Sequence, residues 1–113
     1  MNASRSEPIP RPIKSTEYII VFASRQAQTG WRDVLASQKN AVVDAWEMLT
    51  TDPIGESHIR HQLKGSLSTL LHDGTTHDRF QYELKNGARI WYFVDGRTVH
   101  IENVHTRHPN QTK

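Results

Sequence analysis

The last nine residues of the chain gather side chains suited to moving protons and holding phosphate. His105, Arg107, His108 and Lys113 fall within this segment, which contains no acidic residue. Histidine titrates near neutral pH, and arginine and lysine bind phosphate oxygens. The tail therefore predicts a site that grips a phosphate group and transfers a proton. The alternative is a solvated C-terminus without such a role.

The strand that begins at Arg89 is predicted to place this tail beside an arginine. Asp95-Gly96 is a typical tight turn, and a second strand follows from Thr98 to His105. Because antiparallel neighbours run back along each other, we expect His105 to lie close to Arg89. Lys64, from the segment after the helices, is expected to join them at the same end of the sheet.

Alternation along the strands predicts two faces of a sheet. The apolar floor for the helices is assigned to Phe80, Tyr82, Leu84, Ile90, Tyr92 and Val94. On the opposite face we expect Arg79 and Arg89 to be displayed beside Trp91 and Phe93. Arginine holds phosphates and aromatic rings stack on bases, so this face is a candidate nucleic-acid-binding surface. A solvated face whose aromatic rings cover one another is the alternative.

The elements that must position these residues follow in the order strand, helix, helix, and then three or four antiparallel strands. Residues 18–22 are a β-rich run, Ser24 caps a first helix, and a second helix spans residues 38–51 before Pro53. Asn86-Gly87 predicts a hairpin. We therefore predict an α+β fold with both helices on one face of a three- to four-stranded, mainly antiparallel sheet. Trp31 and Trp46 are expected to pack in the core.

The composition indicates one small domain. The chain has 113 residues, 35% of them hydrophobic, with a formal charge of +2 and a pI near 9.2. This balance permits a nucleic-acid partner without requiring one. The absence of cysteine excludes disulfides and thiolate chemistry. No apolar stretch is long enough to span a membrane, so we expect a cytoplasmic protein without a membrane partner.

The first 15 residues contain three prolines and little that could pack. We interpret residues 1–15 as a flexible N-terminal arm and residues 16–113 as the folded domain. The arm is either an extension without a role or a segment that docks on a partner.

Histidine spacing raises the question of a metal. His58 and His61 are three residues apart, as are His105 and His108. Zinc needs three or four ligands with a firm second shell, and neither an HExxH motif nor cysteine is present. We expect no metal and no cofactor.

The residues considered so far, taken together, resemble the RelE/ParE superfamily of toxins from bacterial type II toxin–antitoxin pairs. The likeness covers about residues 16–113 and includes Ala-Trp-x-x-Leu in the second helix, Ala45 to Leu49. Its other matching segments are Leu63-Lys64-Gly65, Arg79-Phe80-Gln81-Tyr82, Ala88-Arg89-Ile90-Trp91-Tyr92 and His105 to Thr112. The resemblance implies a RelE-like fold.

The resemblance also implies an activity, namely that of an endoribonuclease that cleaves mRNA, mostly on the ribosome, and thereby inhibits translation. Arg89 matches the family's strand arginine, His108 the terminal histidine of the YoeB-like branch, and Lys64 the lysine after the helices. His61 falls where some members have a glutamate base. Implied partners are a cognate antitoxin, mRNA and the ribosome, with DNA bound only through the antitoxin complex.

The mechanism that we expect from these residues is metal-independent attack by a ribose 2′-hydroxyl. His108 is assigned as general acid and His61 or His105 as base. Arg89 and Arg79 would clamp the phosphate, and Lys64 would add charge. Trp91 would stack on a base, with Arg107 and Lys113 binding RNA. Two alternatives remain: a ParE-like inhibitor of DNA gyrase that acts by binding, and an inactive member that serves as a binding or regulatory protein.

Overall fold

The protein has an α+β fold, shown by a computed structural model that describes residues 6–107. The predicted site residues His108 and Lys113 lie outside the described residues. The elements are β1 (Ile19–Phe22), α1 (Arg25–Ser37), α2 (Lys39–Thr51), β2 (Arg60–Gln62), the short 3₁₀ helix η1 (Gly65–Leu67), β3 (Thr69–His72), β4 (Thr75–Asp78), β5 (Phe80–Glu83), β6 (Arg89–Asp95) and β7 (Thr98–His105).

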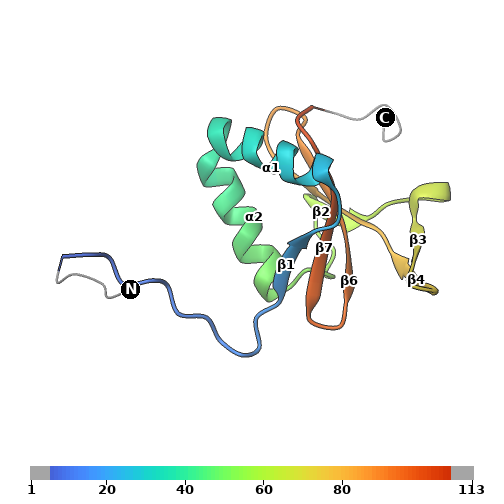
Figure 1. Cartoon of the computed structure of the whole chain (residues 1–113). Helices are drawn as coiled ribbons and strands as arrows, with labels where there is room; N and C mark the ends of the chain where they lie inside the picture. Colours follow the sequence, from blue (N-terminus) through green and yellow to red (C-terminus); the bar gives the residue numbers. More distant parts are fainter. Residues whose placement is uncertain (1–5, 108–113) are drawn as a thin grey trace.

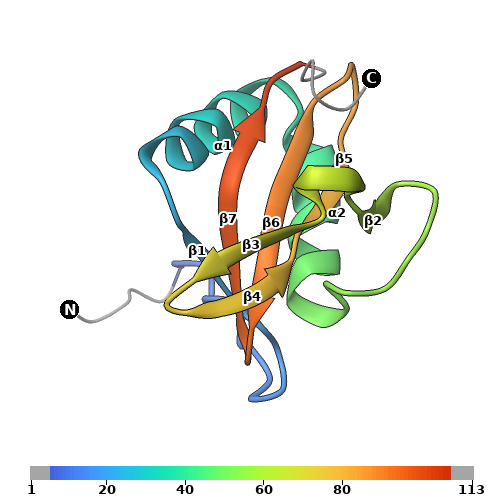
Figure 2. The same cartoon turned by 90° about the vertical axis from the view of Figure 1, so that its right-hand side faces the viewer.

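The described residues form a five-stranded main sheet in the order β1-β7-β6-β5-β2, and β3 and β4 form a separate hairpin. Helices α1 and α2 cover one face of the main sheet, and the hairpin lies on the other side (Figures 1 and 2). The predicted arrangement of two helices on one face of a mainly antiparallel sheet is therefore confirmed. The predicted number of three to four strands in this sheet was too low, because the first strand joins it beside β7 and brings the number to five.

The helices begin and end where local sequence requires. The Ser24 side chain accepts a hydrogen bond from the Ala27 N–H and caps α1. Helix α2 ends at Thr51, before Asp52 and the proline that follows it. Val34 of α1 and Val42, Ala45 and Leu49 of α2 are buried and form the helical side of the core.

The predicted apolar floor is also confirmed. Phe80, Tyr82, Ile90 and Tyr92 are buried against the helices, together with residues of β7, and Leu84 and Val94 pack at the margin. Trp31 and Trp46 lie at the edge of this core, with ring centroids 6.1 Å apart, and Trp46 is 40% exposed. The prediction that both tryptophans pack in the core is therefore confirmed only in part. Trp31 is partly buried against the core, whereas Trp46 is exposed.

The first strand enters the sheet in a way that the linear pattern did not predict. Strand β1 pairs in parallel with β7, with Ile19 opposite Thr98 and Phe22 opposite Ile101. The remaining pairs of the main sheet are antiparallel. The hairpin between β5 and β6 turns at Asn86-Gly87 as predicted, and both residues have positive φ. The next turn uses Gly96-Arg97, one residue later than predicted, because Asp95 pairs with Thr98.

The hairpin of β3 and β4 was missed in the sequence, although a signal for it exists. Its turn is Asp73-Gly74, and both residues have positive φ, as a two-residue turn of this kind requires. The strands on either side have four residues each and few large apolar side chains. The Asp-Gly pair was therefore the one local indication of this element.

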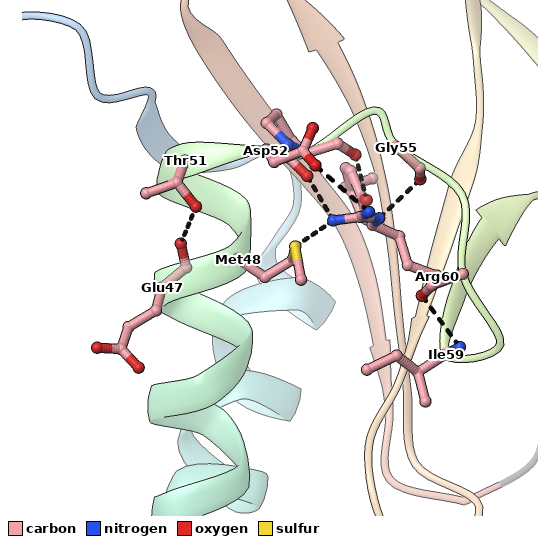
Figure 3. A network of polar contacts seen from close by, with 10 residues as sticks. Glu47, Met48, Thr51, Asp52, Gly55, Ile59 and Arg60 are labelled. Carbon is pink, nitrogen blue, oxygen red and sulfur yellow. Dashed lines mark hydrogen bonds and ion pairs between the residues drawn. The ribbon is translucent and has the colours of Figure 1, made fainter.

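Arg60 anchors the loop between α2 and β2 (Figure 3). Its side chain is 6% exposed, and its Nε and Nη1 donate to the carbonyl oxygens of Gly55 and Asp52, each at 2.6 Å. Nη1 also contacts the Met48 sulfur, and Nη2 lies 3.5 Å from the Asp52 carboxylate. A buried charge is tolerated only where such partners replace water. Arg60 is thus a structural centre that sequence reasoning overlooked.

Helix α1 crosses β7 at Gly30 without room for a side chain. A Cβ atom at this position would stand 2.3 Å from the Val104 carbonyl oxygen and 2.8 Å from its Cβ. Glycine lowers helix propensity, so its presence here is explained by the close approach. We expect Gly30→Ala to lower the free energy of unfolding by about 1–3 kcal/mol, as for overpacked cores. Urea denaturation measures this change. The control is Ala36→Gly, at an exposed α1 position where only helix propensity is altered. An unchanged urea midpoint for Gly30→Ala would contradict the steric argument.

The described part of the arm, from residue 6, is exposed and contains no helix or strand before β1. Arg11 lines a hollow with Thr50 and Thr51 at the end of α2. In residues 6–107 there is no helix with the length and apolar character needed to cross a membrane.

Candidate functional site

Arg89 and His105 face each other on neighbouring strands. They are directly paired in the register of β6 and β7, at the end of the sheet where β6 begins. The same position on β5 is taken by Glu83, which pairs with Arg89 from the other side. The predicted meeting of Arg89 and His105 is confirmed.

A β-bulge in β7 turns His105 onto the face away from the helices. Trp91 pairs with Asn103, but the next residue, Tyr92, pairs with Ile101, so Glu102 has no partner opposite. The extra residue reverses the alternation of side chains beyond it. Val104 therefore joins Ile101 in the core, and His105 points with Arg89 to the outer face. Strict alternation from Ile101 would have sent His105 inward.

Side chains at the start of α1 hold the last residues of β7. These residues lie beyond the end of β1, which pairs with β7 only as far as Ile101. The Gln26 amide accepts from the Val104 N–H at 3.0 Å and donates to the Val104 carbonyl at 2.8 Å. The Ser24 hydroxyl donates to the Glu102 carbonyl at 2.6 Å. These bonds replace a missing strand partner, so the backbone that carries His105 is fixed by the helix.

The Arg89 guanidinium is largely buried but incompletely bonded. Its Nη2 lies 3.4 Å from Glu83 Oε1, and its Nη1 donates to the Ala88 carbonyl at 3.2 Å. Its Nε and the Nε2 of His105 are both buried and have no hydrogen-bond partner among residues 6–107. Buried polar atoms are rarely left unpaired, and a catalytic role is one of the reasons for an exception. Burial also lowers the pKa of His105.

Trp91 supports the site from beneath instead of being displayed. It is 6% exposed, its ring meets His105 edge to face at 4.5 Å, and its Nε1 donates to Gln81 Oε1 at 2.9 Å. Phe93 is 1% exposed. The expectation that both rings are exposed was wrong, because the β3–β4 hairpin and neighbouring side chains cover this face.

Arg79 belongs to a different part of the outer face. It makes a two-pronged ion pair with Glu102, at 2.8 and 3.1 Å, and both side chains are 17% exposed. Arg79 precedes β5 and Glu83 ends it, so Arg79 and Arg89 lie toward opposite ends of this strand. Glu102 follows the buried Ile101 and so points to the outer face, where it meets Arg79.

Lys64 lies at the Arg79 end. The Leu63 N–H donates to the Arg79 carbonyl, and Lys64 follows as an exposed residue before η1. The register therefore separates it from Arg89 by about five residue steps, or roughly 17 Å along the strands. The expectation that Lys64 gathers with Arg89 and His105 was wrong, because β2 runs antiparallel to β5 and carries Lys64 away from them.

Of the other predicted residues, Arg107 lies near the Arg89–His105 pair and His61 does not. His61 pairs with Gln81 on the edge strand β2, two strands away from β6. Arg107 is exposed two residues beyond β7 and so lies at the same end as His105. Within residues 6–107, no group of three histidine or acidic side chains is arranged to hold a metal ion.

Three histidines that sequence reasoning did not single out surround Phe93. His100 stacks on the Phe93 ring at 4.6 Å, and His72 and His77, from the hairpin, approach the same ring at 4.9 and 5.1 Å. The contacts join β3 and β4 to β6 and β7. Burial and the neighbouring His72 lower the pKa of His100, although Asp95 and Asp73 oppose this shift.

The lowered pKa values of His100 and His105 predict that the protein loses stability in mild acid. His100 and His105 both have pKa values below the ordinary 6.5, so below that pH the unfolded chain binds more protons than the folded one. Stability should be highest above pH 6.5 and should fall as the pH drops through the lowered pKa values. Thermal melting between pH 8 and 5 measures the effect, and His100→Phe, which keeps the stacked ring, should flatten the curve. A melting temperature independent of pH would contradict the prediction.

Comparison with known proteins adds no family assignment, since no protein-family model matches the chain and no curated protein matches it significantly. The case for a function therefore depends on the residues and on the geometry described above.

Proposed function

We propose that this protein is a metal-independent endoribonuclease of RelE-like fold, acting as the toxin of a type II toxin–antitoxin pair by cutting mRNA on the ribosome. The observation that carries the proposal is the pairing of Arg89 with His105 on adjacent strands. A guanidinium binds a phosphate, and an imidazole beside it exchanges a proton with the reacting oxygens. Both side chains have a buried nitrogen without a partner among the described residues.

The surroundings of this pair support the proposal. Trp91, which is hydrogen-bonded to Gln81, packs under His105, and this contact favours a fixed orientation of the imidazole. Arg107 adds an exposed positive charge at the same end of the sheet. A basic rim of this kind attracts the RNA backbone. Lys64 and Arg79 would serve the more distant part of a bound strand.

The cleavage assay uses purified protein, a cell-free translation reaction and a capped reporter mRNA whose 5′ ends are mapped after incubation. We expect new ends within the translated codons and a loss of protein synthesis. The same mRNA without ribosomes tests whether the ribosome is required. Inhibition of translation with intact mRNA would contradict the nuclease proposal.

The outer surface of the helices favours a second candidate, a gyrase inhibitor that acts by binding. Phe22, Trp31 and Trp46 form a chain of edge-to-face contacts at 6.1 Å each, and Val43 and Leu35 are 44% and 40% exposed nearby on the helices. Exposed apolar surface of this kind is typical of protein contacts. A DNA supercoiling assay with purified gyrase distinguishes the two candidates.

An antitoxin partner, as the resemblance implies, would be found by co-purification with the product of the neighbouring gene.

A further inference from the structure

The β3–β4 hairpin lies on the outer face of the main sheet without joining it. In the described part of the chain its two strands pair only with each other. Figure 2 shows the hairpin crossing in front of β6 and β7. Its base is fixed, because the Arg79 N–H donates to the Ser68 carbonyl at 2.8 Å. Within the two strands, Leu70, His72 and His77 are partly buried and all other residues are exposed, so these three side chains hold the hairpin against the sheet.

The two histidines of the hairpin meet a stacked pair of rings on the sheet. The His72 ring centroid lies 4.9 Å from that of Phe93 and 5.1 Å from that of His100. His77 lies 5.1 Å from Phe93 and 6.1 Å from His72. Uncharged imidazole rings pack favourably against a phenyl ring, and Phe93 is 1% exposed. Three titratable rings therefore surround one apolar ring.

We propose that the hairpin is an acid-responsive cover, which lies on the outer face while the three histidines are neutral and swings away from the sheet when they are protonated. Protonation in the closed position gathers positive charges whose ring centroids are 5.1 and 6.1 Å apart. Opening separates His72 and His77 from His100 and returns them to water. A phenyl ring stabilises one cation over its face, but it does not offset the repulsion among three. This behaviour is independent of the chemistry at Arg89 and His105.

The hydrogen bonding of His77 supports the proposal. Its Nε2 is buried and has no partner among residues 6–107. A neutral imidazole tolerates one unpaired nitrogen, but an imidazolium has a proton on each nitrogen and needs two acceptors. Protonation of His77 is therefore unfavourable while the hairpin is closed. The pKa of His100 is shifted in the same sense, since burial and then the neighbouring His72 lower it.

The acidic groups beside the cluster do not hold the hairpin closed. The Asp73 carboxylate lies 3.3 Å from His72 Nε2, but both residues belong to the hairpin and stay together when it opens. Asp95 ends β6 and stays near His100 in both positions. Each carboxylate thus stabilises a protonated histidine equally in the closed and the open position.

The other elements around the cluster add no net charge that changes on opening. Strand β1 places the uncharged Val21 opposite His100. Arg79 and Glu102 neutralise each other in their ion pair at 2.8 Å. Asp78 of β4 follows His77 and is exposed. Repulsion among the three histidines is therefore the electrostatic interaction that opening relieves.

The test follows hydrogen exchange of backbone amides in the full chain at pH 8 and at pH 5, corrected for the intrinsic effect of pH on exchange. A detached hairpin with strands of four residues is not stable alone, so its amides lose protection when it leaves the sheet. We expect the corrected exchange of the hairpin amides to be roughly tenfold faster at pH 5. The amides of β6 and β7 should remain much better protected.

Variants identify the titrating groups. Replacing His72, His77 and His100 together by phenylalanine keeps three packed rings and removes the charges, so the corrected exchange of the hairpin should be the same at both pH values. His58→Gln removes an exposed histidine from the turn before β2 and should respond like the wild type. If the triple variant does not fold, His77→Phe alone should weaken the response, because the nitrogen that it replaces at Nε2 makes no hydrogen bond.

Three results would overturn the proposal. Corrected exchange of the hairpin that is equal at pH 8 and pH 5 in the wild type means that the hairpin stays closed in acid. Equal protection of the hairpin and of β6 and β7 at pH 5 means that the whole domain unfolds and the hairpin does not move separately. A folded triple variant that responds like the wild type means that the histidines are not the trigger.

Discussion

Replacing Arg89 with alanine is expected to slow mRNA cleavage by about 10²–10³-fold, the effect of removing one preorganised charge-stabilising group from an active site. The phosphorane formed during attack carries more negative charge than the bound RNA, so the loss should appear in the maximal rate more than in binding. Single-turnover cleavage of ribosome-bound mRNA measures the rate. RNA binding is measured separately on a 2′-deoxy substrate.

Two variants make the Arg89 experiment specific. Arg32→Ala removes an exposed arginine from α1, on the helical layer, and should leave cleavage unchanged. Arg89→Lys keeps the charge without the planar fork that binds two phosphate oxygens, so we expect intermediate activity. If Arg89→Ala is folded and cleaves as fast as the wild type, Arg89 has no part in the chemistry.

Arg60→Ala should cost about 3–5 kcal/mol of unfolding free energy. The substitution leaves the carbonyl oxygens of Gly55 and Asp52 without their donor, at about 1–3 kcal/mol for each one that stays buried, and it also opens a cavity. Small domains are stable by about 5–15 kcal/mol, so the variant should be marginal or unfolded. Urea denaturation followed by tryptophan fluorescence measures the loss.

The neighbouring Asp52→Asn change tests the origin of this effect. The Asp52 side chain is 63% exposed and its contact with Arg60 is long, at 3.5 Å, so the charge pair should contribute less than about 1 kcal/mol. We therefore expect Asp52→Asn to be nearly as stable as the wild type. If it destabilises the protein as much as Arg60→Ala, the ion pair, and not the carbonyl bonds, anchors the loop.

Local sequence patterns predicted those parts of the fold that depend on neighbours in the chain. Period-two alternation identified the floor under the helices, and the Asn86-Gly87 turn and the strand from Thr98 to His105 were correct. These features also brought the end of that strand close to Arg89, but the common face of His105 and Arg89 depends on the bulge in β7. Turn chemistry and antiparallel pairing are set within about twenty residues, so a linear reading can reach them.

The largest errors in the prediction involve contacts between distant segments. Alternation assigns Trp91 and Phe93 to the outer face, but it cannot show that a hairpin and three histidines will bury Phe93 there. Burial of Arg60 depends on carbonyl groups of a loop whose course no periodicity reveals. The position of Lys64 depends on the direction of the edge strand β2.

The parallel pairing of β1 with β7 has a consequence for how the protein is made. The first strand of the domain needs the last one as its neighbour, and β7 also lies between β1 and β6. During synthesis β1 and both helices emerge first, but the central strand that they pack against is still inside the ribosome. The chain must therefore close its longest loop last, which is a slow kind of folding event. Until β7 has emerged, a nascent chain therefore has no assembled Arg89–His105 pair.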